Sequence, residues 1–557
     1  MRWPTIAVAL AICLLAPASA AAQEDPANEP PFGGERPPAL VEPQSLTVPP
    51  PGFEISASEA MAAAAATDVV RAELAETAGA KPKPYIRGDR WQVSYYAPGG
   101  EQVAQVILDG QTGAVDEAWR DQQVETKLAR GYEGAIAQKV NAPYVWLPLC
   151  VLFLAPFFDP RRPFRLLHVD LLVVIGLSLS LYFFNRAEIN ASVALTYPVL
   201  GYFVVRMLVA GLWPRDRPGP LVPFASARLL MVGLVALLAA RAALNVVDSH
   251  VIDVGVAGVI GADHITSGDP LYEGTFPALI QRGDVYGPAN YLAYVPFEQL
   301  FPWHGTWDDV PAAHAAAIVF DLLTALGLVA LGRRLRSGAD GRLLGLALGF
   351  AWAACPWTLS EMNANANDGL IAALGVGALL TLTSPAARGV MVALAAAAKF
   401  GSAALAPLFA TADGERRWRA ATIFTVAFVA ICLVVIVPFL PDGGWREFYD
   451  RTLGYQASRG SPFSVWGLAP SLHFLQPVAR ALAIAFAFAV AFYPRFKTPV
   501  QIAALACAVT IAVQLTANHW FYFYVVWFLP FALVASFASQ LDVSRRSGSR
   551  AGRAAAS

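Results

Sequence analysis

Charge is scarce in this sequence. Only 15% of the 557 residues are Asp, Glu, Lys or Arg, whereas 56% are hydrophobic. Soluble globular chains carry about 25% charged residues, so this composition excludes an ordinary soluble domain and indicates a polytopic membrane protein. The net charge is -1, and no basic block of the kind that binds nucleic acid dominates the chain.

Cysteine is scarce as well. Five Cys residues occur, and all of them lie in apolar runs: Cys13, Cys150, Cys355, Cys432 and Cys507. Extracellular disulfide frameworks and zinc sites need Cys residues at close, regular spacings in polar segments. Because this chain has no Cys residues at such spacings, a disulfide framework and a zinc site are both excluded, and the sequence predicts no metal site.

The N-terminus has the pattern of a secretory signal. Arg2 precedes an apolar run of about ten residues, and the small residues Ala18-Ser19-Ala20 follow as a cleavage site. We assign residues 1–22 to this signal, with an uncleaved anchor as the alternative. Residues 23–54 are rich in Pro, Gly and Glu and are predicted to form a tether.

A small exported α+β domain is predicted over residues 55–135. Ala57 to Ala78 has helical spacing of apolar residues, and the sequence from Trp91 to Val115 contains two alternating strands separated by Pro98-Gly99-Gly100. The segment VILDGQTGAVDEAW, from Val106 to Trp119, resembles PepSY domains. That resemblance implies a binding or inhibitory role rather than catalysis.

From Ala142 onward the chain is a series of apolar runs separated by breaks. Arg-rich breaks indicate the cytoplasmic side; they are RRPFR (161–165), PRDRPGPLVPFASAR (214–228), RRLRSGADGR (333–342), ERRWR (415–419), PRFK (494–497) and the tail at 541–557. We therefore predict an all-α polytopic membrane bundle with about thirteen membrane helices. Residues 142–224 form additional helices before a core at 225–540.

The acidic loop between residues 248 and 309 is predicted to face the opposite, extracytoplasmic side. The helix near 310–332 must return the chain to the Arg cluster at 333, so the apolar segment from Pro288 to Pro302 cannot be a full crossing. We predict that it lies in the membrane interface, with its aromatic side chains as anchors. The same parity predicts that residues 387–411 form a short hairpin of two half-length helices turning near Lys399.

The order and sidedness of several motifs resemble a known enzyme fold. DSHVIDVGVAGVIGADHITSGDPLYEG precedes GDVYGPANYLAYVPFEQLFPW, and LGRRLR, SEMNANANDG, AAAAKF and NHWFYFYVVWFLPF follow in that order. This series is similar to the GT-C glycosyltransferases that use polyprenyl-phosphate sugars, and most similar to family 87, a mannosyltransferase-like group. The resemblance covers roughly residues 225–540.

The resemblance implies transfer of mannose or a similar hexose or pentose from a polyprenyl-phosphate donor to an extracytoplasmic glycan, lipid or protein. It implies the cell membrane as the location and no nucleic-acid partner. No cofactor is expected, although a divalent cation is not excluded. The alternatives are a transporter of lipid-linked substrates, which inverted repeats would favour, and a scaffold or regulator built around the exported domain.

Inverting transfer needs a carboxylate that accepts the proton of the acceptor hydroxyl. Asp253 is the first candidate, because it follows the end of a predicted span at Val247 and the family has an Asp base in its first large outer loop. Asp248 and Asp284 are the other candidates. For each of the three, a solvated or helix-capping carboxylate is the alternative.

The leaving lipid phosphate needs a cation. Lys399 at the predicted hairpin tip is the candidate, with snorkelling to the surface as the alternative. Tyr286, Arg459 and His519 are further predicted donor-binding residues, each of which is equally explained by a structural role. Asn365 and Asp368 are predicted to bind the acceptor or to be structural, Asp368 as a helix cap.

Overall fold

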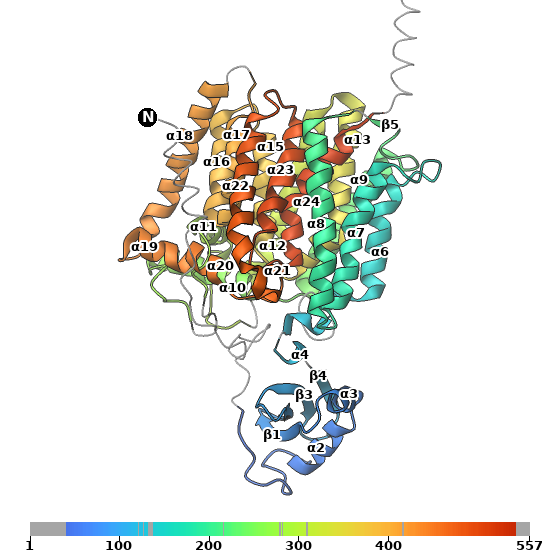
Figure 1. Ribbon diagram of the computed structural model, residues 1–557, viewed down its shortest axis with the longest axis vertical. Helices are drawn as coiled ribbons and strands as arrows, with labels where there is room; N and C mark the ends of the chain where they lie inside the picture. Colours follow the sequence, from blue (N-terminus) through green and yellow to red (C-terminus); the bar gives the residue numbers. More distant parts are fainter. Residues whose placement is uncertain are drawn as a thin grey trace, which may run out of the picture.

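The computed structural model describes residues 40–120, 122–125, 127–131, 138–215, 217–277, 280, 282–307, 310–414 and 417–541. These residues form a small α+β domain and a large helical bundle, one beyond the end of the other (Figure 1). The predicted signal at 1–22, the first part of the tether and the tail from residue 542 lie outside the described residues.

The small domain packs two helices on one face of a four-stranded antiparallel sheet. Its elements are α2 (Ala57–Ala65), α3 (Asp68–Glu76), β1 (Lys81–Arg87), β2 (Arg90–Tyr96), β3 (Gln102–Asp109) and β4 (Val115–Arg120), with the strands in sequential order. Trp91, Val93 and Tyr95 alternate along β2 and are buried in the core of this domain.

The prediction of one helix and two strands was incomplete. The helical run is divided because the side chain of Thr67 accepts a hydrogen bond from Val70 N and starts a second helix. β1 contains Pro82 and Pro84, which made it unlike a strand in the sequence; as an edge strand of the sheet it tolerates both. Val41, at the end of the predicted tether, pairs with Ile86 on that strand.

The bundle combines long and short apolar helices. In the described part of the chain six helical segments are long and apolar enough to cross a membrane. Four are single helices: α7 (Leu166–Phe184), α8 (Ile189–Leu212), α9 (Ala227–Val247) and α12 (Pro311–Leu335); the other two are Trp418–Phe439, in which η6 (Val437–Phe439) continues α18 (Arg417–Ile436), and Pro470–Phe492, in which α22 (Gln476–Phe492) continues η8 (Pro470–Leu475). A seventh crossing is formed if α13 (Gly338–Ala354) and α14 (Pro356–Asn363), bent by 57° at Pro356, count as one span.

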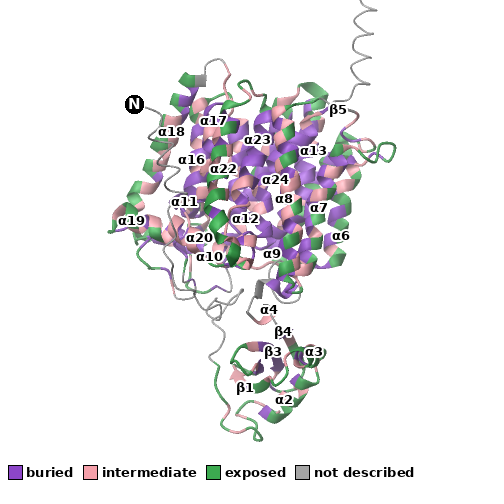
Figure 2. Cartoon of the chain, viewed as in Figure 1, coloured by how far each residue is buried: buried purple, intermediate pink, exposed green. Residues whose placement is uncertain are grey.

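Six further apolar helices have only 10–17 residues. They are α6 (Pro143–Leu154), α15 (Asp368–Leu380), α16 (Pro385–Ala398), the pair η5 (Phe400–Leu405) and α17 (Ala406–Ala410), α23 (Pro499–Gln514) and α24 (Val525–Ala538). The buried residues gather on α23 and α24 in the middle of the bundle (Figure 2). A mostly helical protein with six or seven candidate membrane spans is confirmed, but a total of about thirteen membrane helices is not.

The hairpin predicted between residues 387 and 411 is confirmed as a structural element. α16 ends at Ala398, Lys399 has an extended backbone, and η5 and α17 continue the chain. Arg388 near the start of α16 donates from Nε to the carbonyl of Phe409 at 2.9 Å and also pairs with Asp413. The two ends of the segment therefore meet, with Lys399 at the turn between them.

Two of the aromatic side chains after Gly287 that the sequence predicts as interfacial anchors, Tyr291 and Tyr294, are buried inside the protein instead. They belong to α11 (Pro288–Glu298), in which both are fully buried. Their rings pack against Gly261 and Gly258 of α10 (Asp253–Ser267), where a larger side chain would collide with them. The lack of Cβ atoms on α10 lets α11 approach closely, and this contact covers the aromatic face with protein.

Two charged pairs lie inside the bundle. Arg206 and Asp170 join α8 to α7 at 2.9 Å, and Arg241 and Asp321 join α9 to α12 at 2.6 Å. All four side chains are buried. Pairing is the usual way in which a charge is accommodated among membrane helices, so these residues hold helices together and are not available for chemistry.

Candidate active site

Asp253 is the first residue of α10, at the end of the bundle that faces the small domain (Figure 1). The segment leading to it is held by the loop that follows α14. Ile252 N donates to Ala364 O at 3.1 Å, and the Asn365 side chain donates to His250 O at 3.0 Å. Gly255 has no side chain, which leaves room for the Asn365 carbonyl. The backbone around Asp253 is thus fixed from a distant part of the sequence.

Asn365 has a positive φ of 51°, a conformation that Asn tolerates better than most residues. Its Oδ1 accepts a hydrogen bond from Asn245 Nδ2 at 2.9 Å, and its Nδ2 also donates to Ser249 Oγ at 3.0 Å. Both ends of the amide are therefore engaged in holding α9, the Asp253 segment and this loop together. Of the two roles predicted for Asn365, these contacts fit the structural one.

Lys399 is buried at the hairpin turn rather than extended toward a surface. Its Nζ lies 2.5 Å from Asp368 Oδ1 at the start of α15, and Trp527 Nε1 donates to the same oxygen at 2.6 Å. The rings of Tyr286, Tyr524 and Trp527 surround the ammonium group at 5.3, 5.8 and 5.4 Å. An ion pair inside an aromatic cage positions this cation firmly.

The turn containing Tyr286 and Gly287 docks on the hairpin. Gly287 N donates to Ala398 O at 3.1 Å, and a Cβ atom at this position would overlap the carbonyl of Ala397. Only glycine allows such a close approach. The docking places the Tyr286 ring beside Lys399, which explains why a Gly-Pro turn precedes the apolar segment of α11.

Arg459 and His519 come from two loops that are tied together. Arg459 follows the π-helix Asp450–Gly454 and the short α20 (Tyr455–Ser458), and single π-turns are frequent at functional sites. Asn518 Nδ2 donates to the carbonyl of Arg459 at 3.1 Å, and His519 Nδ1 lies 2.9 Å from Ser461 Oγ. Asn518 was not recognised in the sequence, which offers no motif for it.

These residues form one charged cluster, which consists of Asp253, Asp368, Lys399, Arg459 and His519. Burial raises the pKa of the Asp253 carboxyl group, the nearby charges of Arg459 and Lys399 act to lower it, and Asp368 adds to the rise. Burial and the same two cations hold the pKa of His519 well below its usual value. The cluster thus contains a carboxylate poised to take a proton, two cations and a neutral imidazole.

The other two predicted carboxylates point to different partners. Asp284 is buried and pairs with Arg451 at 2.8 Å, so it ties the loop before α11 to the π-helix. Asp248 pairs with Lys139 at 3.0 Å, in the segment between the small domain and the bundle. Neither belongs to the charged cluster, and Asp253 is the predicted base that meets both cations.

The arrangement suits a reaction in which a proton is removed and an anion departs. A buried carboxylate such as that of Asp253 can accept a proton, and cations such as Arg459 and Lys399 can stabilise negative charge on a leaving group. In the described part of the chain, no group of three or more His, Cys, Asp or Glu side chains is placed to hold a metal ion.

Comparison with known protein families matches residues 285–536 to Glycosyltransferase family 87. The similarity predicted from the sequence is confirmed for this segment, and the family implies a membrane glycosyltransferase. The matched range includes Tyr286, Lys399, Arg459 and His519 but begins after Asp253. No curated protein and no solved structure matches the chain.

Proposed function

We propose that this membrane glycosyltransferase moves mannose or a similar sugar from a polyprenyl-phosphate donor to a hydroxyl group of an extracytoplasmic glycan, lipid or protein. The observation that carries the proposal is the burial of Asp253 at the start of α10, where the charges of Arg459 and Lys399 act on its carboxyl group. A base and two cations at the end of apolar helices are what a donor with a lipid tail and a phosphate head requires.

Arg459 is the better candidate for direct contact with the donor phosphate. Lys399 is already neutralised by Asp368. Among the described residues no carboxylate forms an ion pair with Arg459, although the charge of Asp253 acts on it. A partly buried guanidinium without an anionic partner favours binding of an anion such as phosphate. Lys399 then holds Tyr286, Tyr524 and Trp527 in place and adds positive potential.

In the proposed reaction Asp253 takes the proton of the acceptor hydroxyl. The acceptor oxygen forms a bond to the anomeric carbon as the bond from that carbon to the phosphate oxygen breaks. The electron pair of the broken bond stays with the lipid phosphate, whose charge Arg459 and Lys399 stabilise. The anomeric configuration is inverted, because a single displacement takes place.

Purified protein in nanodiscs is expected to transfer labelled sugar from a polyprenyl phosphate. Donors carrying mannose, arabinose and glucose should be offered separately with extracted envelope glycans and lipids as acceptors. A deletion strain should accumulate the lipid-linked sugar that the enzyme uses. Absence of transfer from every donor, together with an unchanged lipid-linked sugar pool in the deletion strain, would overturn the proposed function.

The proposal places the charged cluster on the extracytoplasmic side, and labelling of introduced cysteines tests this. Gly460 lies in an exposed loop beside the cluster, and Ala339 lies in the exposed first turn of α13, next to the Arg cluster at 333–336. A membrane-impermeant thiol reagent added to intact cells should label Gly460→Cys and spare Ala339→Cys until the membrane is opened. The reverse pattern would contradict the proposed orientation.

A further inference from the structure

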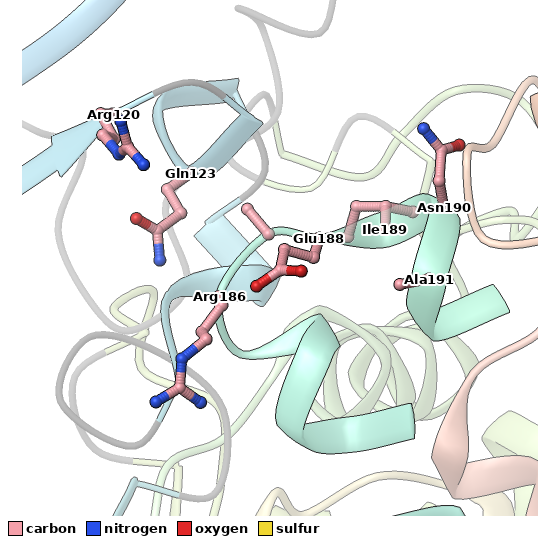
Figure 3. A pocket seen from close by; sticks show the side chains of 8 residues that line it. Arg120, Gln123, Arg186, Glu188, Ile189, Asn190 and Ala191 are labelled. Carbon is pink, nitrogen blue, oxygen red and sulfur yellow. The ribbon is translucent and has the colours of Figure 1, made fainter. Parts of the chain in front are cut away.

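A polar pocket of about 560 Å³ lies between the small domain and the turn that joins α7 to α8. Arg120 and Gln123, at the end of the small domain, form one side, and the residues from Arg186 to Ala191 form the other (Figure 3). All of its lining residues precede residue 285, so the pocket is outside the segment that matches family 87. Neither Asp253 nor Lys399 contributes to it.

The turn on the bundle side of the pocket has an unusual backbone. Ala187 has a positive φ of 59°, a left-handed conformation that residues with a Cβ atom rarely adopt. Hydrogen bonds from Ala187 N to Phe184 O at 2.8 Å and from Glu188 N to Phe183 O at 3.0 Å maintain this conformation. The turn presents Arg186 and Glu188 on either side of the nearly buried Ala187. Such conformations concentrate at functional sites.

The opposite wall is held against this turn. Gln123 Nε2 lies 3.5 Å from the carbonyl of Asn185, and Gly131 packs against the same residue. The segment that contains Gln123 is fixed to the sheet of the small domain, because Arg130 covers the Trp119 ring at 5.0 Å and bonds to Gln105 at 3.3 Å. The small domain therefore meets the bundle at a defined place.

The pocket lining has the chemistry of a saccharide site. It combines two guanidinium groups, two side-chain amides and one carboxylate, from Arg120, Arg186, Gln123, Asn190 and Glu188. Each is a planar group that can donate to or accept from sugar hydroxyl groups. Arg186 lies 3.7 Å from the Tyr182 ring, which limits the directions that its guanidinium can take.

The pocket is joined to the charged cluster through an aromatic contact. Phe184, just before the turn, packs against Phe463 at 5.1 Å and Phe521 at 5.6 Å. Phe463 in turn packs against His519 at 5.3 Å, in the loop next to Arg459. Both sites are at the same end of the bundle (Figure 1).

We propose that this pocket binds part of a glycan acceptor, so that the small domain and the α7–α8 turn together form an acceptor subsite. Identifying the bound glycan as an acceptor rests on the proposed function, whereas glycan binding itself does not require sugar transfer. The pocket and α10, which begins with Asp253, lie at the same end of the bundle, so this subsite gives the small domain a role in choosing the acceptor.

Glycan binding to the full-length protein in nanodiscs tests the proposal directly. Fluorescent oligosaccharides of mannose, arabinose and galacturonic acid serve as neutral hexose, neutral pentose and anionic probes. At least one should bind, and Arg186→Ala and Asn190→Ala should each weaken it at least about tenfold, the effect of losing one hydrogen bond to a charged or amide group. Arg71→Ala, which removes an exposed Arg of α3 that pairs with Asp68, is the matched control and should bind like wild type.

Failure of this inference differs from failure of the proposed function. No binding of any probe by the wild type, or equal binding by all variants, would overturn the pocket as a glycan site even if transfer takes place. Binding that depends on Arg186 and Asn190 without any transfer would leave the glycan site standing and remove the glycosyltransferase proposal. If the pocket binds glycan and the protein also transfers sugar, Arg186→Ala should raise the KM for the glycan acceptor. Its donor binding should equal that of the Arg71→Ala control.

Discussion

Asp253→Asn is expected to reduce sugar transfer by at least about 10²-fold, the usual effect of losing a general base, while donor binding changes little. Asn keeps the size of the side chain, and its Oδ1 can still accept the hydrogen bond from Val254 N that Asp253 accepts at 2.8 Å, so the beginning of α10 should keep its structure. Transfer of labelled sugar at saturating donor, alongside direct donor binding, separates chemistry from affinity. Asp263→Asn, on the same helix and partly buried, is the matched control and should retain activity.

The pH dependence of transfer adds a second test of Asp253. A base works only when deprotonated, and burial raises the pKa of this carboxyl group. Activity should therefore fall on acidification through a pKa above about 3.9, the usual value for Asp, and stay high above that pKa. If Asp253→Asn turns over at the normal rate, or the acidic limb persists unchanged in a partly active variant, another group is the base and Asp248 or Asp284 must be tested.

Lys399→Met is expected to have the largest effect on both folding and donor binding. It leaves Asp368 buried without its cation, and breaking a buried ion pair in this way costs about 3–5 kcal/mol. Donor affinity should also fall, because the positive potential is lost and the rings of Tyr286, Tyr524 and Trp527 lose the group that they surround. Thermal unfolding in detergent and donor binding in nanodiscs measure the two effects.

The double variant Lys399→Met/Asp368→Asn separates the two roles. Neutralising both partners removes the unpaired charge, so most of the lost stability should return. Donor binding should remain weak, since the cation is still missing. Full recovery of donor binding and transfer in the double variant would show that Lys399 has a structural role only and would leave Arg459 as the phosphate ligand.

The short hairpin was predictable from the spacing of charged breaks along the sequence. The hairpin around Lys399 followed from the Arg residues that flank an apolar run too short for two crossings, and Arg388 does contact Phe409 and Asp413 at its other end. The sides of a membrane constrain where charged residues occur along a chain, so the positions of charged residues in the sequence are enough to predict a hairpin of this kind.

Features that depend on what covers a helix were not predictable. Tyr291 and Tyr294 were assigned to the lipid interface, yet they are buried against glycines of α10. An aromatic side chain is equally suited to lipid and to a protein interior, so composition cannot distinguish the two. Thr67, which begins a second helix in the small domain, likewise acts through a local cap that the apolar spacing conceals.

By itself the sequence determined that the chain forms many apolar helices, that a short hairpin places Lys399 at its turn, and that Asp253 follows the long apolar helix ending at Val247. Only the tertiary structure decided which carboxylate forms an ion pair with which cation. Asp284 pairs with Arg451, Asp248 with Lys139 and Asp368 with Lys399, whereas Asp253 forms no ion pair among the described residues and is acted on by the charges of Arg459 and Lys399. These partners are far apart along the chain, and Coulombic interaction depends on distance in space and on burial, neither of which the linear order of residues contains.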